Sequence, residues 1–393
     1  MARFNPKSFS DIDQLKRITP VVLLRLLEPQ RPFFGDRGFA FSAAEEEIDY
    51  RSLVAILAQP DENMNADLVE AFHLIGALGT DENYDQLLEL ARQNNIDTGG
   101  DQATAPDLAA RIWLSNSQIL ERMERTELFE RRKKFESFRA REPEEFVPVE
   151  GLPDDLSPLE EDLDAWFKSK KRGVGTRIIR NDAPGEMRFL IQHGQPCKRE
   201  PSRKGRNSTC TFFRPERTDL VIIDAVNNEL RVNASSLAEI KLYRQMFGKH
   251  LFGDEEKFVY TEKYTLDPLK EQGEDALCCR DIAGMEWVRL TEIEYDWGGS
   301  PKHIEKHKAN DVFLALVLRE RSIERAAEIR MAKFNVKLEG LKRPRSVLIR
   351  PWNTAEYGRG EPALIIEEWL RARGFVLVGS AASAEVIPTL AGA

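Results

Sequence analysis

The chain has 393 residues, of which 41% are hydrophobic and 9% aromatic, and its net charge is −9. This apolar content is enough for packed cores and excludes a chain that is disordered throughout, while the length favours two or three domains. No run approaches the about 20 apolar residues that a membrane-spanning helix needs, and the N-terminus lacks an apolar signal segment. We therefore expect a cytoplasmic protein that does not bind a membrane.

Residues 1–141 have the apolar spacing of helices. Thr19 and Pro20 form a typical helix start, and apolar residues recur at helical intervals from Asp67 to Leu78. The region from Pro106 to Arg141 is predicted as one long helix or two, because opposite charges stand four residues apart along its second half. We expect a helical domain over residues 1–141 that contacts partner protein chains.

Residues 142–164 contain ten acidic residues, no Lys or Arg, and four prolines. Proline interrupts helices, and like charges repel one another, so such a segment favours an extended chain. We predict an acidic, proline-rich linker over residues 142–164, closed by a short helix around Leu159 to Phe167.

Residues 165–300 are predicted to form a basic, β-rich domain. Turn residues at 181–185 and at Asn227-Asn228 each separate two apolar runs, which predicts two antiparallel hairpins. We expect a short strand at Thr209–Phe213 and a loop from Lys198 to Arg206. Ser235 or Ser236 is placed to cap a helix that we expect to end at Gly248.

Residues 301–393 are predicted as a C-terminal α+β region. We expect a helix from Asp311 to Arg330, paired strands at Lys333–Leu338 and Ser346–Ile349, and a last helix from Pro362 to Arg373. The fold class is therefore α+β: an N-terminal helical domain, an acidic linker, an antiparallel β-rich domain and a C-terminal α+β portion.

The clearest functional feature is the run of cations that follows the linker. From Lys168 to Arg217 there are fourteen Lys and Arg against four Asp and Glu, a net charge of +10 (14 − 4), and Arg319 to Arg350 has ten against four. Many cations on one surface bind phosphates by releasing counterions, and Phe189, His193, Phe212 and Phe213 are suited to stack on bases if exposed. The candidate nucleic-acid-binding residues are Lys170, Lys171, Arg172, Arg177, Arg180, Lys198, Arg199, Arg203, Lys204, Arg206, Arg214, Arg217, Lys342, Arg343 and Arg345.

The alternative is that these cations lie on several faces of a sheet or pair with carboxylates elsewhere in the chain. The linker allows a further hypothesis, because its charge of −10 adjoins the +10 segment. It would lie over the basic surface and compete with phosphate as an autoinhibitory mimic, whereas the plain alternative is a solvated tether.

A metal-dependent nuclease is a second candidate function. Asp219 and Asp224 bracket a predicted strand, and Glu239 and Lys241 follow; carboxylates of this kind hold Mg²⁺ while a Lys orients water. However, Glu239 and Lys241 fall within a predicted helix, where residues two apart point in different directions.

The remaining motifs favour no cofactor and no metal. His303 and His307 stand four apart, but Lys302, Lys306 and Lys308 beside them would repel a cation. The four cysteines form no CxxC pair, and phosphate-loop, dinucleotide and Gly-x-Ser-x-Gly motifs are absent from the sequence.

The sequence therefore predicts a non-catalytic nucleic-acid-binding or adaptor subunit of an intracellular assembly. A role in defence against foreign DNA is compatible with this function, although no residue points to it. The alternatives are a nuclease that uses Asp219 and Asp224, and a protein-interaction scaffold without nucleic-acid contact.

Overall fold

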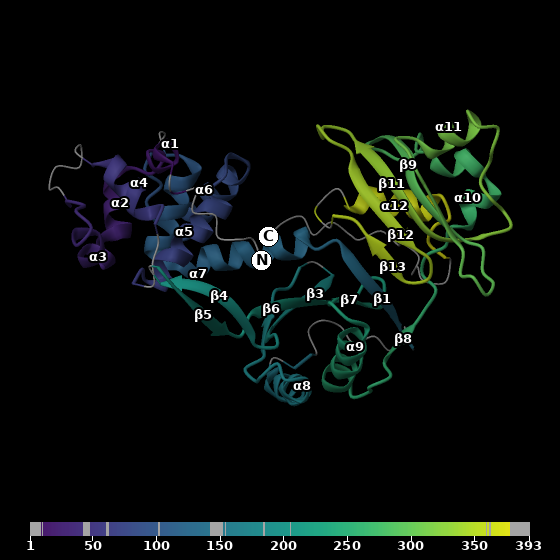
Figure 1. Cartoon of the computed structure of the whole chain (residues 1–393). Coiled ribbons are helices and arrows are strands. Elements are labelled where there is room, and N and C mark those ends of the chain that lie inside the picture. The colour runs from purple at the N-terminus through teal and green to yellow at the C-terminus, as the bar shows by residue number, and fades with distance from the viewer. Residues whose placement is uncertain are drawn as a thin grey trace, which may run out of the picture. The chain divides into compact units, whose positions relative to one another are not determined.

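The computed structural model describes residues 9, 11–41, 48–59, 63–100, 103–141, 152–153, 155–183, 185–204, 206–358, 360 and 363–377. The chain forms two compact units, Met1–Leu128 and Phe129–Ala393. The first is helical, and the second carries an eleven-stranded sheet and a separate two-stranded sheet, so the fold is α+β as predicted (Figure 1). Most of the predicted linker lies outside the described residues, and the domain boundaries at 141, 164 and 300 stay predictions.

The helical unit is held by one apolar core, to which Leu23, Phe34, Phe72 and Leu74 contribute fully buried side chains. The buried carboxylate of Asp107 accepts hydrogen bonds from the Thr19 backbone N–H and from Arg111 Nε, each at 2.7 Å, and so ties the start of one helix to another. The helices are α1 (Ile12–Leu15), α2 (Pro20–Leu27), α3 (Arg31–Gly35), α4 (Tyr50–Leu57), α5 (Ala66–Leu78), α6 (Tyr84–Gln93) and α7 (Ala105–Arg131), the last of which continues into the second unit.

Helix α7 is interrupted at Asn116, whose backbone is extended (φ −159°, ψ 100°). The Asn116 side chain accepts a hydrogen bond from the Gln118 N–H at 3.1 Å and so caps the second segment, which agrees with the alternative of two helices. The helix predicted to reach Arg141 is wrong beyond Arg131, because Lys134–Ala140 form strand β1. Strand neighbours on both edges satisfy the backbone of this segment, which local charge spacing could not reveal.

The large sheet is antiparallel along the path β10-β9-β11-β12-β13-β1-β7-β6-β3-β2. One edge of β1 pairs with β7, and the other pairs first with β13 and then with β8. The strands are β1 (Lys134–Ala140), β2 (Arg177–Arg180), β3 (Glu186–Gly194), β6 (Glu216–Asp224), β7 (Glu229–Asn233), β8 (Phe258–Tyr260), β9 (Met285–Asp296), β10 (Ile304–Lys308), β11 (Glu328–Leu338), β12 (Arg345–Arg350) and β13 (Thr354–Glu356). Two further strands, β4 (Lys198–Lys204) and β5 (Asn207–Phe213), form the small sheet.

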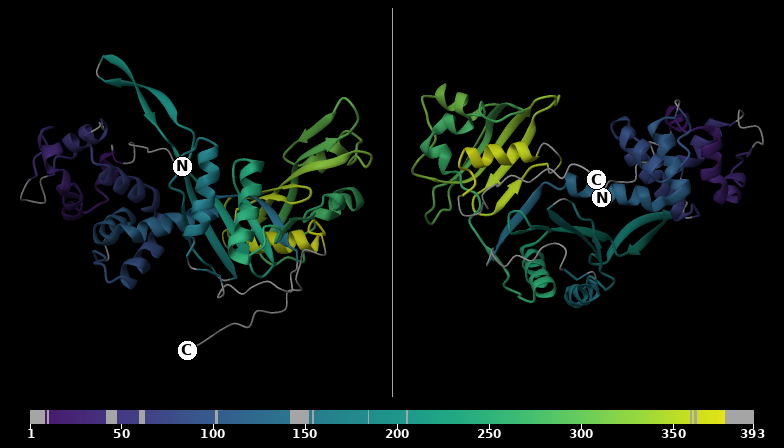
Figure 2. Two further views of the ribbon diagram at one scale, coloured as in Figure 1. Left: turned by 90° about the horizontal axis from the view of Figure 1, so that it is seen from below. Right: turned by 180° about the vertical axis from the view of Figure 1, so that it is seen from behind.

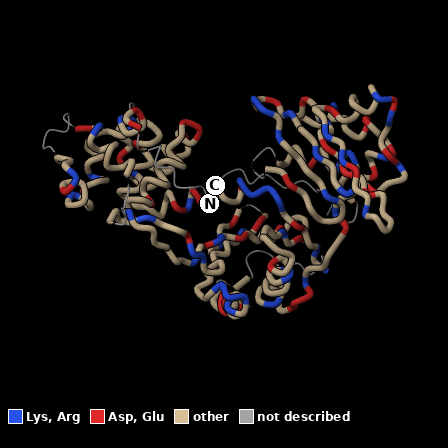
Figure 3. Tube along the Cα trace, viewed as in Figure 1, with Lys and Arg blue, Asp and Glu red and all other residues tan. Residues whose placement is uncertain are grey.

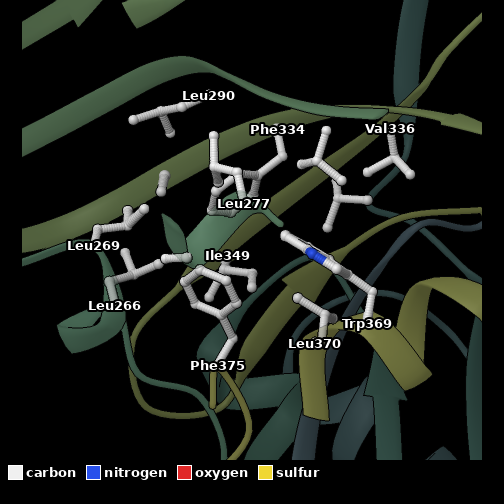
Figure 4. Close-up of a cluster of buried hydrophobic side chains, with 14 of the residues drawn as sticks. Leu266, Leu269, Leu277, Leu290, Phe334, Val336, Ile349, Trp369, Leu370 and Phe375 are labelled. Atoms are coloured by element: carbon white, nitrogen blue, oxygen red, sulfur yellow. The ribbon is translucent and has the colours of Figure 1, made fainter. Parts of the chain in front are cut away.

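Each half of the large sheet has its own core. Helices α8 (Ser157–Ser169) and α9 (Leu237–Phe252) cover β1, β7, β6 and β3, with Leu159, Leu163 and Phe167 forming a stripe at four-residue spacing on α8 (Figure 1). In the other half, helices α10 (Asp267–Glu271) and α12 (Ala363–Ala372) close a core in which the Trp369 ring lies among Phe334 and Phe375 (Figure 4). Helix α11 (Val312–Val317) adds Val312 and Phe313 to it.

The local turn predictions are confirmed. Strands β2 and β3 pair around 181–185, β6 and β7 pair around Asn227-Asn228, and β11 pairs with β12. Two element predictions are wrong. Lys198–Lys204 is a strand and not a loop, and the helix predicted from Asp311 to Arg330 ends at Val317. His303 precedes strand β10 and His307 lies within it.

Helix α9 starts as predicted, because the Ser236 side chain accepts a hydrogen bond from the Glu239 N–H. Its predicted end at Gly248 is wrong. The helix continues to Phe252 and stops at Gly253, which has φ +72°. Gly248 lies inside the helix, where a Cβ would meet the Asp254 carbonyl oxygen at 2.5 Å, so its small size serves close packing.

Trp352, in the turn between β12 and β13, has φ +97°. Its carbonyl oxygen accepts from the N–H groups of Lys263 and Tyr264, and its own N–H donates to the Tyr264 carbonyl, so strand-like pairing holds this backbone in place. An L-residue in this region is strained, and the ring is 44% exposed.

We expect Trp352→Gly to be more stable than Trp352→Ala by about 1–2 kcal/mol, because both remove the ring while only glycine adopts this φ without a Cβ penalty. Urea unfolding of the two purified variants measures the difference. Equal stability of the two, or a more stable alanine variant, would show that the turn carries no strain.

Candidate functional site

Strands β4 and β5 form an arm, defined as residues 198–213, that extends beyond the sheet carrying β3 and β6 (Figure 2). Every described residue of β5 is exposed, as are Lys198, Arg199 and Arg203 on β4 and Arg206 in the turn. Residues 198–206 contain five cations and one acid, Glu200, a net charge of +4 (5 − 1), and Figure 3 shows the Lys and Arg positions along the trace. The arm therefore presents charge to solvent without a core of its own.

The cations of the arm are not neutralised by the protein. Within the described part of the chain, no carboxylate lies within ion-pair distance of Lys198, Arg199, Arg203 or Arg206. The side chain of Lys204 is outside the described atoms. The four described cations of the arm are therefore exposed and have no acidic partner among the described residues, while their binding role stays a prediction.

The register divides the arm into two faces, because residues directly opposite each other in an antiparallel pair point to the same side. The arginine face, as we name it, carries Arg199, Pro201, Arg203, Ser208, Cys210 and Phe212. The lysine face carries Lys198, Glu200, Ser202, Asn207, Thr209, Thr211 and Phe213, and the backbone of Lys204 pairs opposite Asn207.

Several other predicted cations are engaged within the protein. Arg172 pairs with the buried Glu239, Arg180 pairs with Asp182 at 2.8 Å, and Arg217 Nε donates to Asp219 at 2.9 Å. Arg214 donates to the carbonyl oxygens of Lys171 and Gln195, each at 2.9 Å. These four side chains are thus engaged within the protein and lie outside the arm.

Arg214 anchors the base of the arm. Its side chain lies against Gly194, where an added Cβ would come within 2.6 Å of Arg214 Cδ and 2.4 Å of the Arg172 carbonyl oxygen. The Gln195 N–H also donates to the Pro215 carbonyl at 2.8 Å. These contacts fix where the arm leaves β3 and returns to β6.

The remaining predicted cations are dispersed. Lys171 and Arg177 are exposed, and Lys170 Nζ lies 5.5 Å from the Trp166 ring centroid. Lys342 and Arg343 are exposed in the turn between β11 and β12, and Arg345 is exposed at the start of β12. The antiparallel registers place this turn at the same end of the sheet as the arm, but β12 and β6 are separated by four strand steps, or about 19 Å.

Of the four predicted stacking side chains, two are accessible. Phe212 is 71% exposed and Phe213 is 43% exposed. Phe189 and His193 are buried, and His193 stacks on Phe167 with ring centroids 4.1 Å apart. Of these four described residues, the two phenylalanines of the arm are therefore the ones that solvent can reach.

His193 has an acidic partner that sequence spacing did not reveal. Its Nε2 lies 3.0 Å from Asp219 Oδ2, which also accepts the Tyr243 hydroxyl at 2.9 Å. Burial, followed by the nearby Asp219 charge, raises the pKa of Tyr243 well above its ordinary value, so the phenol stays a donor. The pairing of β3 with β6 puts Ile191 opposite Asp219 and so brings His193 close to Asp219. The residues of the arm lie between these two strands in the sequence, so the spacing alone could not show this contact.

His193, Asp219 and Glu239 place potential metal-ligand atoms within 4.8 Å of one another. Both Asp219 oxygens already accept hydrogen bonds from His193, Tyr243 and Arg217, and Glu239 accepts from Arg172, Ser235 and Ser236. Because two guanidinium groups point at these carboxylates, the cluster fits a structural network better than a cation site.

Asp219 and Asp224 do not form one site. They stand five residues apart on β6, about 17 Å along the strand, and odd spacing sends them to opposite faces. Asp224 instead accepts from the Asn227 backbone and side chain and from Arg231. The geometry therefore gives no support to a nuclease built on this pair.

The comparisons with known proteins add no assignment. No protein-family model matches the sequence, and no curated protein matches it either. Among the described residues, the helices are all too short or too polar to cross a bilayer.

Glu239 allows a test of the structural network. Burial alone would raise its pKa, but hydrogen bonds from Ser235, Arg172 and Ser236 outweigh it and lower the pKa to about 2 from 4.5. The folded state therefore has the lower pKa, so the stabilisation is present above about pH 4.5 and is lost as the pH falls towards 2.

We expect Glu239→Gln to destabilise the protein by about 2–3 kcal/mol at pH 7, and the gap from the unmodified protein to shrink below pH 4. Urea unfolding at several pH values measures both effects, with Glu271→Gln on the exposed end of α10 as control. A gap that does not change with pH would contradict the proposed role of the carboxylate.

Proposed function

We propose that this protein binds nucleic acid through the arm and acts as a non-catalytic binding subunit. The observation that carries the proposal is the set of exposed cations at Lys198, Arg199, Arg203 and Arg206, which meet no carboxylate among the described residues. A cation that is kept in water without an internal partner is available to a phosphate.

The energetics of polyanion binding favour this arrangement. Each phosphate that a Lys or Arg neutralises releases condensed counterions, so several cations on one projecting element produce salt-dependent affinity. A two-stranded ribbon also has dimensions that nucleic-acid grooves accept. The whole chain has a net charge of −9, so the arm is a basic element on a chain that is acidic on average.

The ribbon also has features that suit a ligand more than another protein strand. Pro201 has no N–H to offer at the centre of β4, and charged residues on both sides of it discourage edge-to-edge pairing with another sheet. The exposed Lys342, Arg343 and Arg345 would join the contact only on a longer nucleic acid, because β12 is four strand steps from β6.

Replacing Lys198, Arg199, Arg203 and Arg206 together by Ala should weaken binding of a fluorescent 30-nucleotide strand by about 100-fold or more at 100 mM salt. The slope of log K against log salt should lose about 3 units, because about 0.7 counterion is released per phosphate contact. Fluorescence anisotropy over a salt series, with EDTA and with Mg²⁺, measures affinity and would reveal any cleavage.

A matched control removes the same charge elsewhere, at the exposed Arg25, Arg51, Arg92 and Arg280. It should retain affinity within about threefold. If both quadruple variants lose affinity equally, binding follows net charge and the arm has no special role. If the unmodified protein binds no strand at low salt, the proposal fails.

A further inference from the structure

The two faces of the arm differ in charge and in aromatic exposure. On the arginine face, Arg199 and Arg203 stand four residues apart, about 13 Å along the strand, and no acidic side chain lies on that face. On the lysine face, Glu200 stands two residues from Lys198 and would repel a phosphate there. A polyanion therefore meets less repulsion on the arginine face.

Phe212 belongs to the arginine face and lies directly opposite Arg199. Its side chain is 71% exposed, against 43% for Phe213 on the lysine face. Directly opposite residues have Cβ atoms about 5 Å apart, so Phe212 and Arg199 leave the backbone at neighbouring positions on one face. Both groups stack on the flat face of a nucleic-acid base.

Resting on the proposed function, we infer that the arm holds a single strand of nucleic acid along its arginine face, with a base stacked on Phe212. A paired base in a duplex has both of its faces covered by its neighbours, so an exposed ring gains little from it. A ring that wedges into a duplex belongs at a ribbon tip, whereas Phe212 is one pair from the base of the arm, and the tip pair is Lys204 with Asn207.

The matched pair Phe212→Ala and Phe213→Ala tests the face and the strand type. Phe212→Ala should weaken binding of a 20-nucleotide oligothymidine by about tenfold, since a stacked base is worth roughly a factor of 5 to 150. Phe213→Ala should change it by less than threefold. Neither variant should change the affinity for a 20-base-pair duplex, and thermal melting should show both folded, because both rings are solvent-exposed.

The exposed thiols provide a second, independent readout in the same chain. Cys210 lies on the arginine face, while Cys278 is exposed elsewhere in the second unit. Saturating oligothymidine should slow maleimide labelling of Cys210 by at least fivefold and leave Cys278 unchanged, as read by peptide mass. In a Cys210→Ser background, Thr211→Cys reports the lysine face and should be protected less.

The outcomes separate this inference from the proposed function. Equal affinity for strand and duplex, no effect of Phe212→Ala, or stronger protection at Thr211→Cys than at Cys210 overturns the single-strand inference while leaving salt-dependent binding by the arm intact. The proposed function itself is overturned if the unmodified protein binds no nucleic acid. It is also overturned if the protein binds at full affinity after the four arm cations are replaced.

Discussion

The hydrogen bonding of β1 along both of its edges is the constraint on which the second unit depends. Glu136–Arg139 pair with β7, and Lys134–Glu136 pair with β13, so seven residues join two halves that each have a separate apolar core. The helices of each half pack only on the strands of that half. The two apolar cores share no buried residue. Without β1, the inner edges of β7 and β13 would lose the strand that now satisfies their N–H and C=O groups.

The elements that could be predicted from the sequence are those fixed by neighbouring residues. The hairpins β2–β3, β6–β7 and β11–β12 follow from turn residues beside apolar runs, and the start of α9 follows from the Ser236 cap. Strand β1 could not be predicted in this way, because its charge pattern is also that of a helix and its partners are about 95 and 220 residues later. The end of α9 does lie at a glycine with positive φ, but at Gly253, and the local sequence did not distinguish Gly253 from Gly248.

The candidate site shows the same division. Counting charges identified the basic segment, but it could not tell a cation in water from one in an ion pair. Arg172 forms an ion pair with Glu239, 67 residues later in the sequence. Arg214 donates hydrogen bonds at the base of the arm. The arm is therefore anchored at its base, and its exposed cations form no ion pair among the described residues. An isolated two-stranded ribbon is marginally stable in water, which makes the anchoring at Gly194 and Arg214 necessary for a defined arm.

The long sequence separation between β1 and β13 also sets the order of assembly on the ribosome. At about 5–20 residues per second, roughly 10–45 s pass between synthesis of Lys134 and of Glu356. During that interval β1 has emerged, and β7 becomes available before β13 does, so one inner edge stays open until the chain is nearly complete. The half of the sheet that carries the arm is thus made first, and closure by the C-terminal half comes last.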